Sequence, residues 1–208
     1  RRSENVAMRV VWINGWSLEE GPLLSLVTKR FPEHEHLAVA SVPGWGRVLE
    51  EIDGVDVLIG YSLGAFLLMG RLDLCDKAKR TILLAPFEDF RSESDRGGKV
   101  KRGQLSYLLK WLDRDSCAAV TDFRERAGIS ETMSECYRFS AVELKWGIEY
   151  LMTESVELGT AGRFECYFGS EDALLDTYYF ENTYPGIRVI EGTGHDLREL
   201  LEGGLTSL

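Results

Sequence analysis

The segment 60–64, with the sequence GYSLG, places Ser62 between two glycines. It follows a short apolar run rich in β-branched residues and precedes a helix-forming apolar run, an order that predicts a strand, a sharp turn and a helix. Glycines two positions before and after the serine suit such a turn because they have no Cβ. The pattern predicts that the Ser62 hydroxyl projects above the end of a sheet as a nucleophile. The alternative is an ordinary glycine-flanked turn.

A serine hydroxyl attacks a carbonyl only when a base takes its proton and a third group orients that base. The chain has three histidines. His195 follows a strand-like segment through a Gly-Thr-Gly turn and precedes a helical segment, so it is the predicted general base; the alternative is a histidine that merely caps the last helix. His34 and His36 lie between a helical and a strand-like segment, where a solvated turn is favoured over a metal site.

Acidic residues follow the strand-like segment 163–168, where the orienting group is expected. The loop offers Glu171, Asp172 and Asp176. Asp176 would more naturally begin the next helix as its N-cap. Two further aspartates, Asp53 and Asp56, flank the serine strand at its amino end, the wrong edge of the sheet.

Acyl transfer also needs donors aimed at the oxygen that becomes negative, each worth about 3 kcal/mol of the barrier. The backbone N–H of Leu63, directly after the nucleophile, is predicted to be one donor. The loop Asn14-Gly15-Trp16 is predicted to supply the other, and the Asn14 side chain is an alternative donor or a brace for the loop.

Composition limits the class of protein. At 208 residues, with 44% hydrophobic and 11% aromatic content, the chain fits one domain, residues 1–208. The net charge of −10 argues against nucleic acid as a partner. No apolar run is long enough to span a bilayer and no hydrophobic signal segment precedes Met8, so a cytoplasmic monomer is expected, with residues 1–7 a leader or a remnant of expression.

The four cysteines are expected to be reduced thiols. They are Cys75, Cys117, Cys136 and Cys166. Neither a metal nor an organic cofactor is predicted.

Strand-like and helix-like segments alternate, as in a mainly parallel sheet with helices on both faces. Six strands are predicted, at 8–13, 36–42, 55–61, 81–85, 163–168 and 187–191. Helices are predicted at 20–30, from Ser62 to about Leu74, near 177–181 and at 196–202. Between them the segment 87–161, named the cap segment below, has helical periodicity over 104–112, 116–127 and 142–152. We expect it to cover the serine at the carboxyl ends of the strands.

The motifs together resemble the α/β-hydrolase superfamily over nearly all of the chain except the cap segment. The matching motifs are NGW at 14–16, PGWG at 43–46, GYSLG at 60–64, GSED at 169–172 and GTGH at 192–195. The resemblance implies Asp172 as the triad acid and the N–H of Trp16 as the second oxyanion donor. GWSL at 15–18 and YSLG at 61–64 are similar to the biotin-pathway esterases that demethylate pimeloyl-carrier-protein methyl ester. Asn14 where that pattern has histidine, and a short connection from Gly46 to Val55, are departures from it.

The expected function is a serine carboxyl-ester hydrolase that uses Ser62, His195 and Asp172. Its substrate is a small-molecule or carrier-linked acyl ester, and a thioesterase or another acyl hydrolase would use the same groups. Five basic and two acidic residues lie between 91 and 102, a basic edge that would attract an acidic acyl carrier protein or else form a solvated loop. The predicted substrate-binding residues are Asn14, Trp45, Tyr61, Arg96, Lys99 and Arg102.

Tryptophans are the candidates for lining an acyl or alcohol pocket. Trp16 and Trp45 lie in the predicted site loops, whereas Trp111 and Trp146 come from the cap segment, where ordinary packing is favoured. Two other classes of function stay open at this point: a non-catalytic ligand-binding protein on the same scaffold, and a lyase that uses the triad only for proton transfer.

Overall fold

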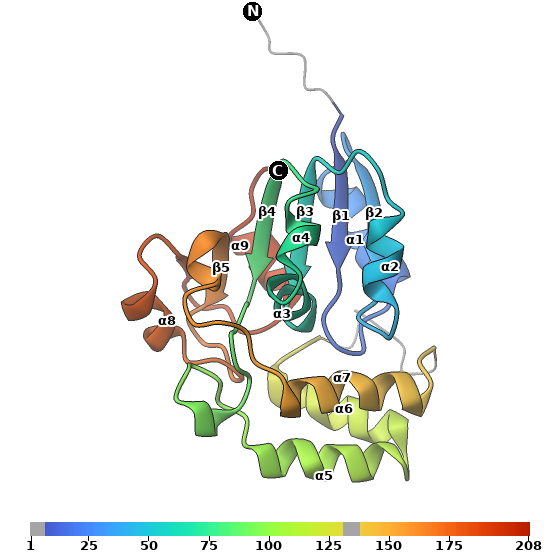
Figure 1. The fold of residues 1–208 in the computed structure, drawn as a ribbon, viewed down its shortest axis with the longest axis vertical. Coiled ribbons are helices and arrows are strands. Elements are labelled where there is room, and N and C mark those ends of the chain that lie inside the picture. Colours follow the sequence, from blue (N-terminus) through green and yellow to red (C-terminus); the bar gives the residue numbers. More distant parts are fainter. Residues whose placement is uncertain (1–6, 131–137) are drawn as a thin grey trace, which may run out of the picture.

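The computed structural model describes residues 7–130 and 138–208. Within them, a six-stranded parallel sheet has the order β2-β1-β3-β4-β5-β6 (Figure 1). Its strands are β1 Arg9–Ile13, β2 Glu35–Val39, β3 Val57–Tyr61, β4 Arg80–Leu84, β5 Glu165–Gly169 and β6 Arg188–Ile190. The predicted α/β class and parallel sheet are therefore confirmed, with strand ends shifted by at most three residues.

The central strands are apolar on both faces because helices cover both sides of the sheet. All five residues of β3 are buried, and in β1 only Arg9 is partly exposed. Figure 1 shows α2, α3 and α4 in front of the sheet and α1 and α9 behind it. The helices outside the cap segment are α1 Glu20–Arg30, α2 Trp45–Glu50, α3 Leu63–Met69, α4 Leu72–Cys75, α8 Thr177–Thr183 and α9 Leu197–Gly203. The described residues also include two single 3₁₀ turns, η1 Ser92–Ser94 and η3 Ala161–Arg163.

Two short helices differ from the sequence-based prediction. The single helix expected to reach Leu74 is divided, because Arg71 leaves helical geometry with φ −137° and ψ 65° and α4 begins after it. The unpredicted α2 starts at the PGWG motif, where Gly44 has φ +90°, a left-handed conformation that glycine adopts at little cost. At six residues α2 is too short to give a periodic signal.

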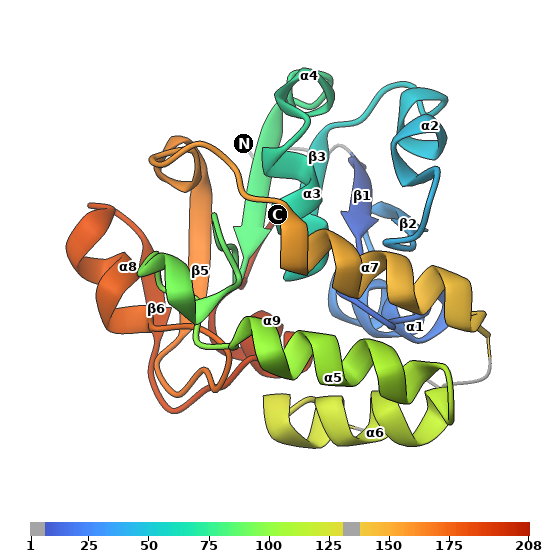
Figure 2. The ribbon, with the colours of Figure 1, turned by 60° about the horizontal axis from the view of Figure 1, so that its bottom comes forward.

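The cap segment forms three helices between β4 and β5: α5 Arg102–Leu112, α6 Ser116–Ala127 and α7 Ala141–Thr153. Their bounds match the predicted helices within two residues. The arrowheads in Figure 1 point at these helices, so the helices lie at the carboxyl ends of the strands, and Figure 2 shows α5 running beside α6 and α7. Residues 131–137, between α6 and α7, lie outside the described part of the chain.

One expectation about the cysteines is wrong. Cys75 and Cys166 are free and buried, but Cys117 is disulfide-bonded, and Cys136 lies outside the described residues. Cysteines far apart in sequence gave no motif from which this bond could have been predicted. Among the described helices, none has both the length and the apolar character needed to cross a membrane.

Candidate active site

Ser62 lies at a sharp turn between β3 and α3. Its backbone has φ +53° and ψ −116°, a conformation that residues other than glycine rarely adopt. Its N–H donates to the carbonyl of Leu84 at 2.9 Å. A Cβ on Gly60 would lie 2.7 Å from Cα of Ala65, and one on Gly64 would collide with the carbonyl of Ile13. The glycines of the GYSLG motif are therefore required by close backbone approach, as the sequence predicted.

The imidazole of His195 lies between Ser62 and Asp172. Its Nε2 is 2.8 Å from Oγ of Ser62 and its Nδ1 is 2.7 Å from Oδ2 of Asp172. The other carboxylate oxygen of Asp172 accepts the N–H groups of Leu174 and Leu175 at 2.8 and 3.0 Å. A carboxylate held in this way accepts Nδ1–H, which leaves Nε2 free to accept the serine proton.

Burial strengthens this arrangement. Asp172 is 2% exposed and His195 is 1% exposed, so their interaction takes place away from the screening of water. Gly169, at the end of β5, lets the histidine loop pass closely, because a Cβ there would collide with the carbonyl of Gly194. The structure thus brings together the three residues predicted as the triad.

Tyr61 contacts the loop that carries His195. Its hydroxyl donates to the backbone carbonyl of His195. Burial, with smaller contributions from the charges of Asp196 and Asp172, raises the pKa of the Tyr61 phenol well above its usual range, so it stays a donor. Tyr61, predicted to bind substrate, here contacts the backbone of the base.

Two backbone N–H groups are available as oxyanion donors. Neither Trp16 N–H nor Leu63 N–H donates to an acceptor within the described residues. Both residues line the same small cavity as Ser62. An N–H pair beside the nucleophile is the arrangement that stabilises a tetrahedral oxyanion.

The cap segment fixes the position of Trp16. The indole Nε1 donates to the carbonyl of Leu144 in α7 at 2.8 Å, and the indole packs edge-on against Phe123 of α6 with ring centroids 4.9 Å apart. Gly147 of α7 touches the same indole, since a Cβ there would lie 2.6 Å from its Cδ1. Two cap helices therefore hold Trp16, whose backbone N–H is a candidate oxyanion donor.

Ser17, the residue after Trp16, is held by the buried guanidinium of Arg124. Ser17 has φ +61°, and Arg124 of α6 donates to its carbonyl and lies 3.3 Å from its Oγ. Arg124 is 6% exposed, and burial lowers the pKa of its guanidinium. The buried Asn14 side chain braces the loop from within by donating to the carbonyl of Leu18 at 3.0 Å. Asn14 is thus a brace, one of the two roles that the sequence left open.

The cavity over Ser62 is nearly closed. Its volume is about 10 Å³, which is room for about one water molecule. Apolar side chains from three parts of the cap segment cover it: Phe90, Phe123, Ile129 and Leu151. The sequence did not predict these residues as part of the site. Helical periodicity indicates that they are buried but not that they pack over Ser62.

Among the other predicted substrate-binding residues, only Lys99 lies next to the triad. Its ammonium donates to the backbone carbonyl of Asp172 at 2.6 Å. Arg96 bonds the carbonyl of Val156, and the Arg102 backbone N–H binds Glu93. Trp45 lines a separate hollow beside Trp146. The structure does not bring Trp45, Arg96 or Arg102 to the Ser62 cavity.

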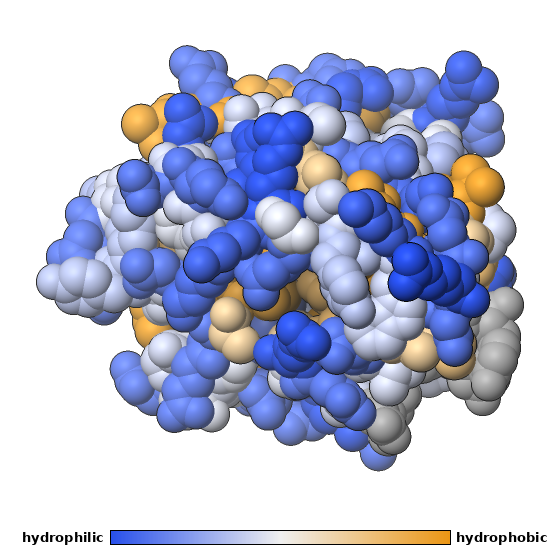
Figure 3. Space-filling model, turned by 90° about the horizontal axis from the view of Figure 1, so that it is seen from below, coloured by the Kyte–Doolittle hydropathy of each residue, from blue (hydrophilic) through white to orange (hydrophobic). Residues whose placement is uncertain are grey.

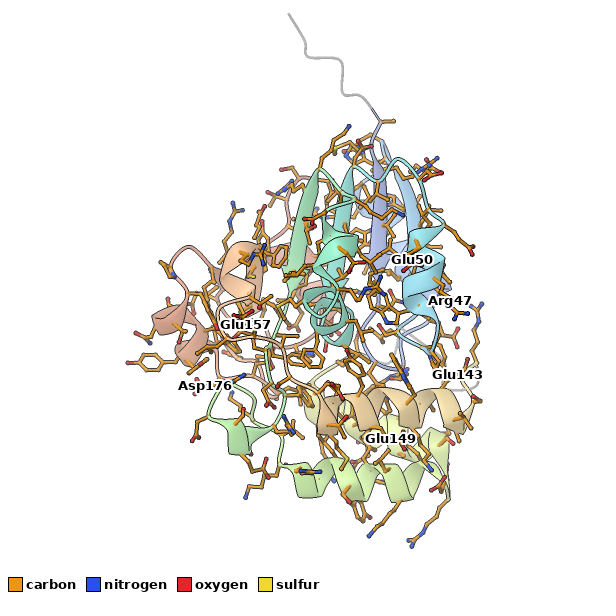
Figure 4. All side chains as sticks on the ribbon, viewed as in Figure 1. Arg47, Glu50, Glu143, Glu149, Glu157 and Asp176 are labelled. Atoms are coloured by element: carbon orange, nitrogen blue, oxygen red, sulfur yellow. The ribbon has the colours of Figure 1, made fainter. Side chains whose placement is uncertain are left out.

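The alternatives to the triad residues have other partners. Asp176 caps α8 by accepting the N–H of Tyr179 at 3.2 Å, and Figure 4 shows it at the start of that helix. His36 accepts from the Trp12 indole at 3.1 Å, and its other ring nitrogen is 2.8 Å from the carbonyl of Phe31. His34 and His36 are therefore packed beside β1, where a solvated turn was expected. In the described residues no group of three or more histidine, cysteine or acidic side chains is placed to hold a metal ion.

Comparisons with known proteins agree with this architecture. No protein-family model matches the sequence, and a search of curated proteins found no match. Among solved structures, the N-acyl homoserine lactonase AidH gives a TM-score of 0.71 at 12% identity, over 98% of this chain and 86% of that one. An esterase from Exiguobacterium antarcticum gives 0.69 at 13% identity, over 91% and 85%. BioG from Haemophilus influenzae gives 0.62 at 10% identity, over 93% and 91%.

At these identities the similarity concerns architecture. The parallel order β2-β1-β3-β4-β5-β6, the serine turn after β3, the acid after β5 and the histidine after β6 occur together in this chain. The protein therefore has the α/β-hydrolase fold.

Proposed function

We propose that the protein is a serine hydrolase that cleaves carboxylic esters through an acyl-enzyme intermediate. One observation supports this most strongly: Ser62, His195 and Asp172 form a continuous hydrogen-bonded chain with 2.8 and 2.7 Å links. The esterase and the lactonase among the solved structures of similar fold act on ester bonds, which supports the same bond type here.

The geometry defines the role of each group. Oγ of Ser62 attacks the carbonyl carbon while Nε2 of His195 takes its proton, and the Asp172 carboxylate stabilises the imidazolium that forms. The backbone N–H groups of Trp16 and Leu63 bind the oxyanion. His195 then gives the proton to the leaving alcohol, and a water molecule activated by His195 releases the acid.

The closed cavity requires a preceding step. No ester fits in about 10 Å³, so the apolar side chains of the cap segment must move apart before the substrate reaches Ser62. In the closed state the same side chains keep bulk water from Ser62. We therefore propose that the cap segment acts as a lid over Ser62.

The most specific substrate that we propose is a pimeloyl-carrier-protein methyl ester. This proposal rests on the GWSL and YSLG motifs. The basic edge at 91–102 is the proposed contact for an acidic carrier. Within it, Arg91 is paired with Asp89 at 2.7 Å and Lys99 with the carbonyl of Asp172. Lys101 and Arg102 are exposed, so they are the residues proposed to meet the carrier.

Hydrolysis is tested with p-nitrophenyl acetate and with a fluorophosphonate probe. We expect wild-type protein to hydrolyse the ester and to be labelled at Ser62. Ser62→Ala should lose at least about 10³-fold in kcat and all labelling. Ser25→Ala, an exposed change on α1, is the matched control and should leave both unchanged. Cleavage of cyanohydrins without ester hydrolysis would instead indicate a lyase, and absence of both activities and of labelling would indicate a binding protein.

The carrier hypothesis is tested separately. Wild-type protein should demethylate the carrier-linked ester, and the double variant Lys101→Glu, Arg102→Glu should raise KM for that substrate while leaving p-nitrophenyl acetate unaffected. If wild type ignores the carrier-linked ester but hydrolyses simple esters, the carrier hypothesis fails and the esterase proposal stands.

A further inference from the structure

A second hollow lies next to the candidate active site. It has a volume of about 340 Å³ and opens between α5, α6 and the loop that follows Asp172. Figure 3 views the molecule from this side and shows hydrophobic atoms at the floor of a depression among hydrophilic ones. The lining residues used below are Lys99, Leu108, Trp111, Asp122, Phe123, Arg126 and Leu174.

Phe123 separates this hollow from the Ser62 cavity. Its side chain lines both spaces and packs edge-on against Trp16. On another wall, Leu174 lines the hollow while its backbone N–H binds the Asp172 carboxylate at 2.8 Å. The hollow thus adjoins the triad, and Phe123 borders both spaces.

The charged groups at the hollow already have partners. Arg126 pairs with Asp122 at 2.9 Å, and Lys99 donates to the backbone carbonyl of Asp172 at 2.6 Å. The wall has both polar and apolar surface, and Leu108 and Trp111 of α5 with Phe123 of α6 supply much of the apolar part. This apolar part suits an alkyl chain, and a carboxylate would have to compete with the existing partners of Arg126 and Lys99.

The volume limits the size of that ligand. At about 340 Å³ the hollow lies near the lower end of small-molecule sites, which are about 300–1,000 Å³, and part of it is open to solvent. The space therefore suits an unbranched chain of medium length, which the test below takes as hexanoate to decanoate.

We propose that the hollow between α5 and α6 is the binding site for a medium-length, uncharged acyl chain of the substrate, and that Phe123 is the specificity-determining residue that admits the chain to Ser62. This inference rests on the proposed esterase function and adds a substrate class to it. The acyl chain lies along Leu108 and Trp111, with its ester carbonyl at Ser62.

The test compares p-nitrophenyl esters from acetate to dodecanoate. For wild type we expect kcat/KM to peak between hexanoate and decanoate, at least tenfold above acetate. Leu108→Trp fills the hollow and should lower the decanoate-to-acetate ratio of kcat/KM at least tenfold. Phe123→Ala removes the barrier and should raise that ratio at least threefold. Lys110→Trp, on the exposed face of the same helix and outside the hollow, is the matched control and should not change the ratio.

The outcomes separate this inference from the proposed function. If Ser62 is labelled and acetate is hydrolysed, but neither Leu108→Trp nor Phe123→Ala changes the chain-length ratio, the inference is overturned and the esterase proposal stands. If no ester is cleaved and Ser62 is not labelled, both are overturned. Should Leu108→Trp fail to fold, Phe123→Ala together with Phe123→Trp, which should lower the ratio, decides the question.

Discussion

Replacing Gly147 by alanine should damage catalysis without touching the triad. A Cβ at this position of α7 would lie 2.6 Å from Cδ1 of Trp16 and 3.1 Å from its Nε1. Ordinary contacts of a Cβ begin at 3.4 Å, so the indole would have to retreat by about 0.8 Å, the difference between those two distances for Cδ1. Trp16 also carries the N–H that we assign to the oxyanion hole, and its indole is bonded to Leu144 of the same helix.

The expected size of the effect follows from this displacement. Complete loss of an oxyanion donor costs about 10²–10³ in kcat, and a misplacement of about 1 Å can cost about 10²-fold. We therefore expect Gly147→Ala to lower kcat/KM by about 10- to 100-fold. Stability should change less, because overpacking costs about 1–3 kcal/mol while alanine gains about 1 kcal/mol over glycine inside a helix.

The assay is kcat/KM on p-nitrophenyl acetate, with the free energy of unfolding measured in urea. Gly21→Ala is the matched control, since Gly21 lies in helix α1 and a Cβ added there would have no atom within 4 Å, so this change should be neutral or slightly stabilising. A folded Gly147→Ala protein with kcat/KM within threefold of wild type would refute the reasoning that the cap helices position the Trp16 donor.

Four further predictions concern buried polar groups. Tyr61→Phe leaves the carbonyl of His195 without its donor, so the free energy of unfolding should fall by about 1–3 kcal/mol in urea titrations; an unchanged value would contradict the assigned bond. Glu88→Ala should cost about 2–4 kcal/mol, because the Glu88 carboxylate accepts a backbone N–H at 2.9 Å and a tyrosine hydroxyl at 2.6 Å, both buried; a loss below 1 kcal/mol would count against this. Burial raises the pKa of the Cys75 and Cys166 thiols from 9.0 to about 12. Native protein at pH 8 should therefore react with a disulfide reagent only as fast as it unfolds, and fast modification of both would contradict the burial. Since the unfolded chain releases these protons near pH 9 and the native chain near pH 12, the contribution of the two thiols to stability should be constant below pH 9 and fall as the pH rises from 9 to 12, which urea titrations across that range would measure.

Much of the site could be predicted because its signals are local. The glycines around Ser62 are dictated by backbone contacts within a few residues, and the loop before His195 is marked by its own glycines. The central strands are apolar on both faces, so the strands and their parallel arrangement could be predicted, whereas their order in the sheet was not predicted. Asp172 was distinguishable from Asp176 once the next helix was recognised, because an aspartate at the first position of a helix is the usual cap.

The remainder depends on long-range packing. Nothing in the local sequence says that Arg124 would be buried against Ser17, 107 positions away, or that Phe123 would lie between two cavities. The basic edge illustrates the same limit: its charge was visible, but the pairing of Arg91 with Asp89 and of Lys99 with the carbonyl of Asp172 depends on the folded backbone. For the same reason Trp45, which lies in the PGWG motif, lines a different hollow from the one at Ser62.

The nucleophile and its base are 133 positions apart, on strands that are not neighbours in the sheet. During synthesis on the ribosome, a nascent chain that has already formed the turn at Ser62 still has no imidazole beside it. The growing polypeptide therefore lacks the complete triad until the segment around His195 has emerged and joined the sheet edge. In refolding experiments, the return of probe reactivity at this serine would report the assembly of the triad.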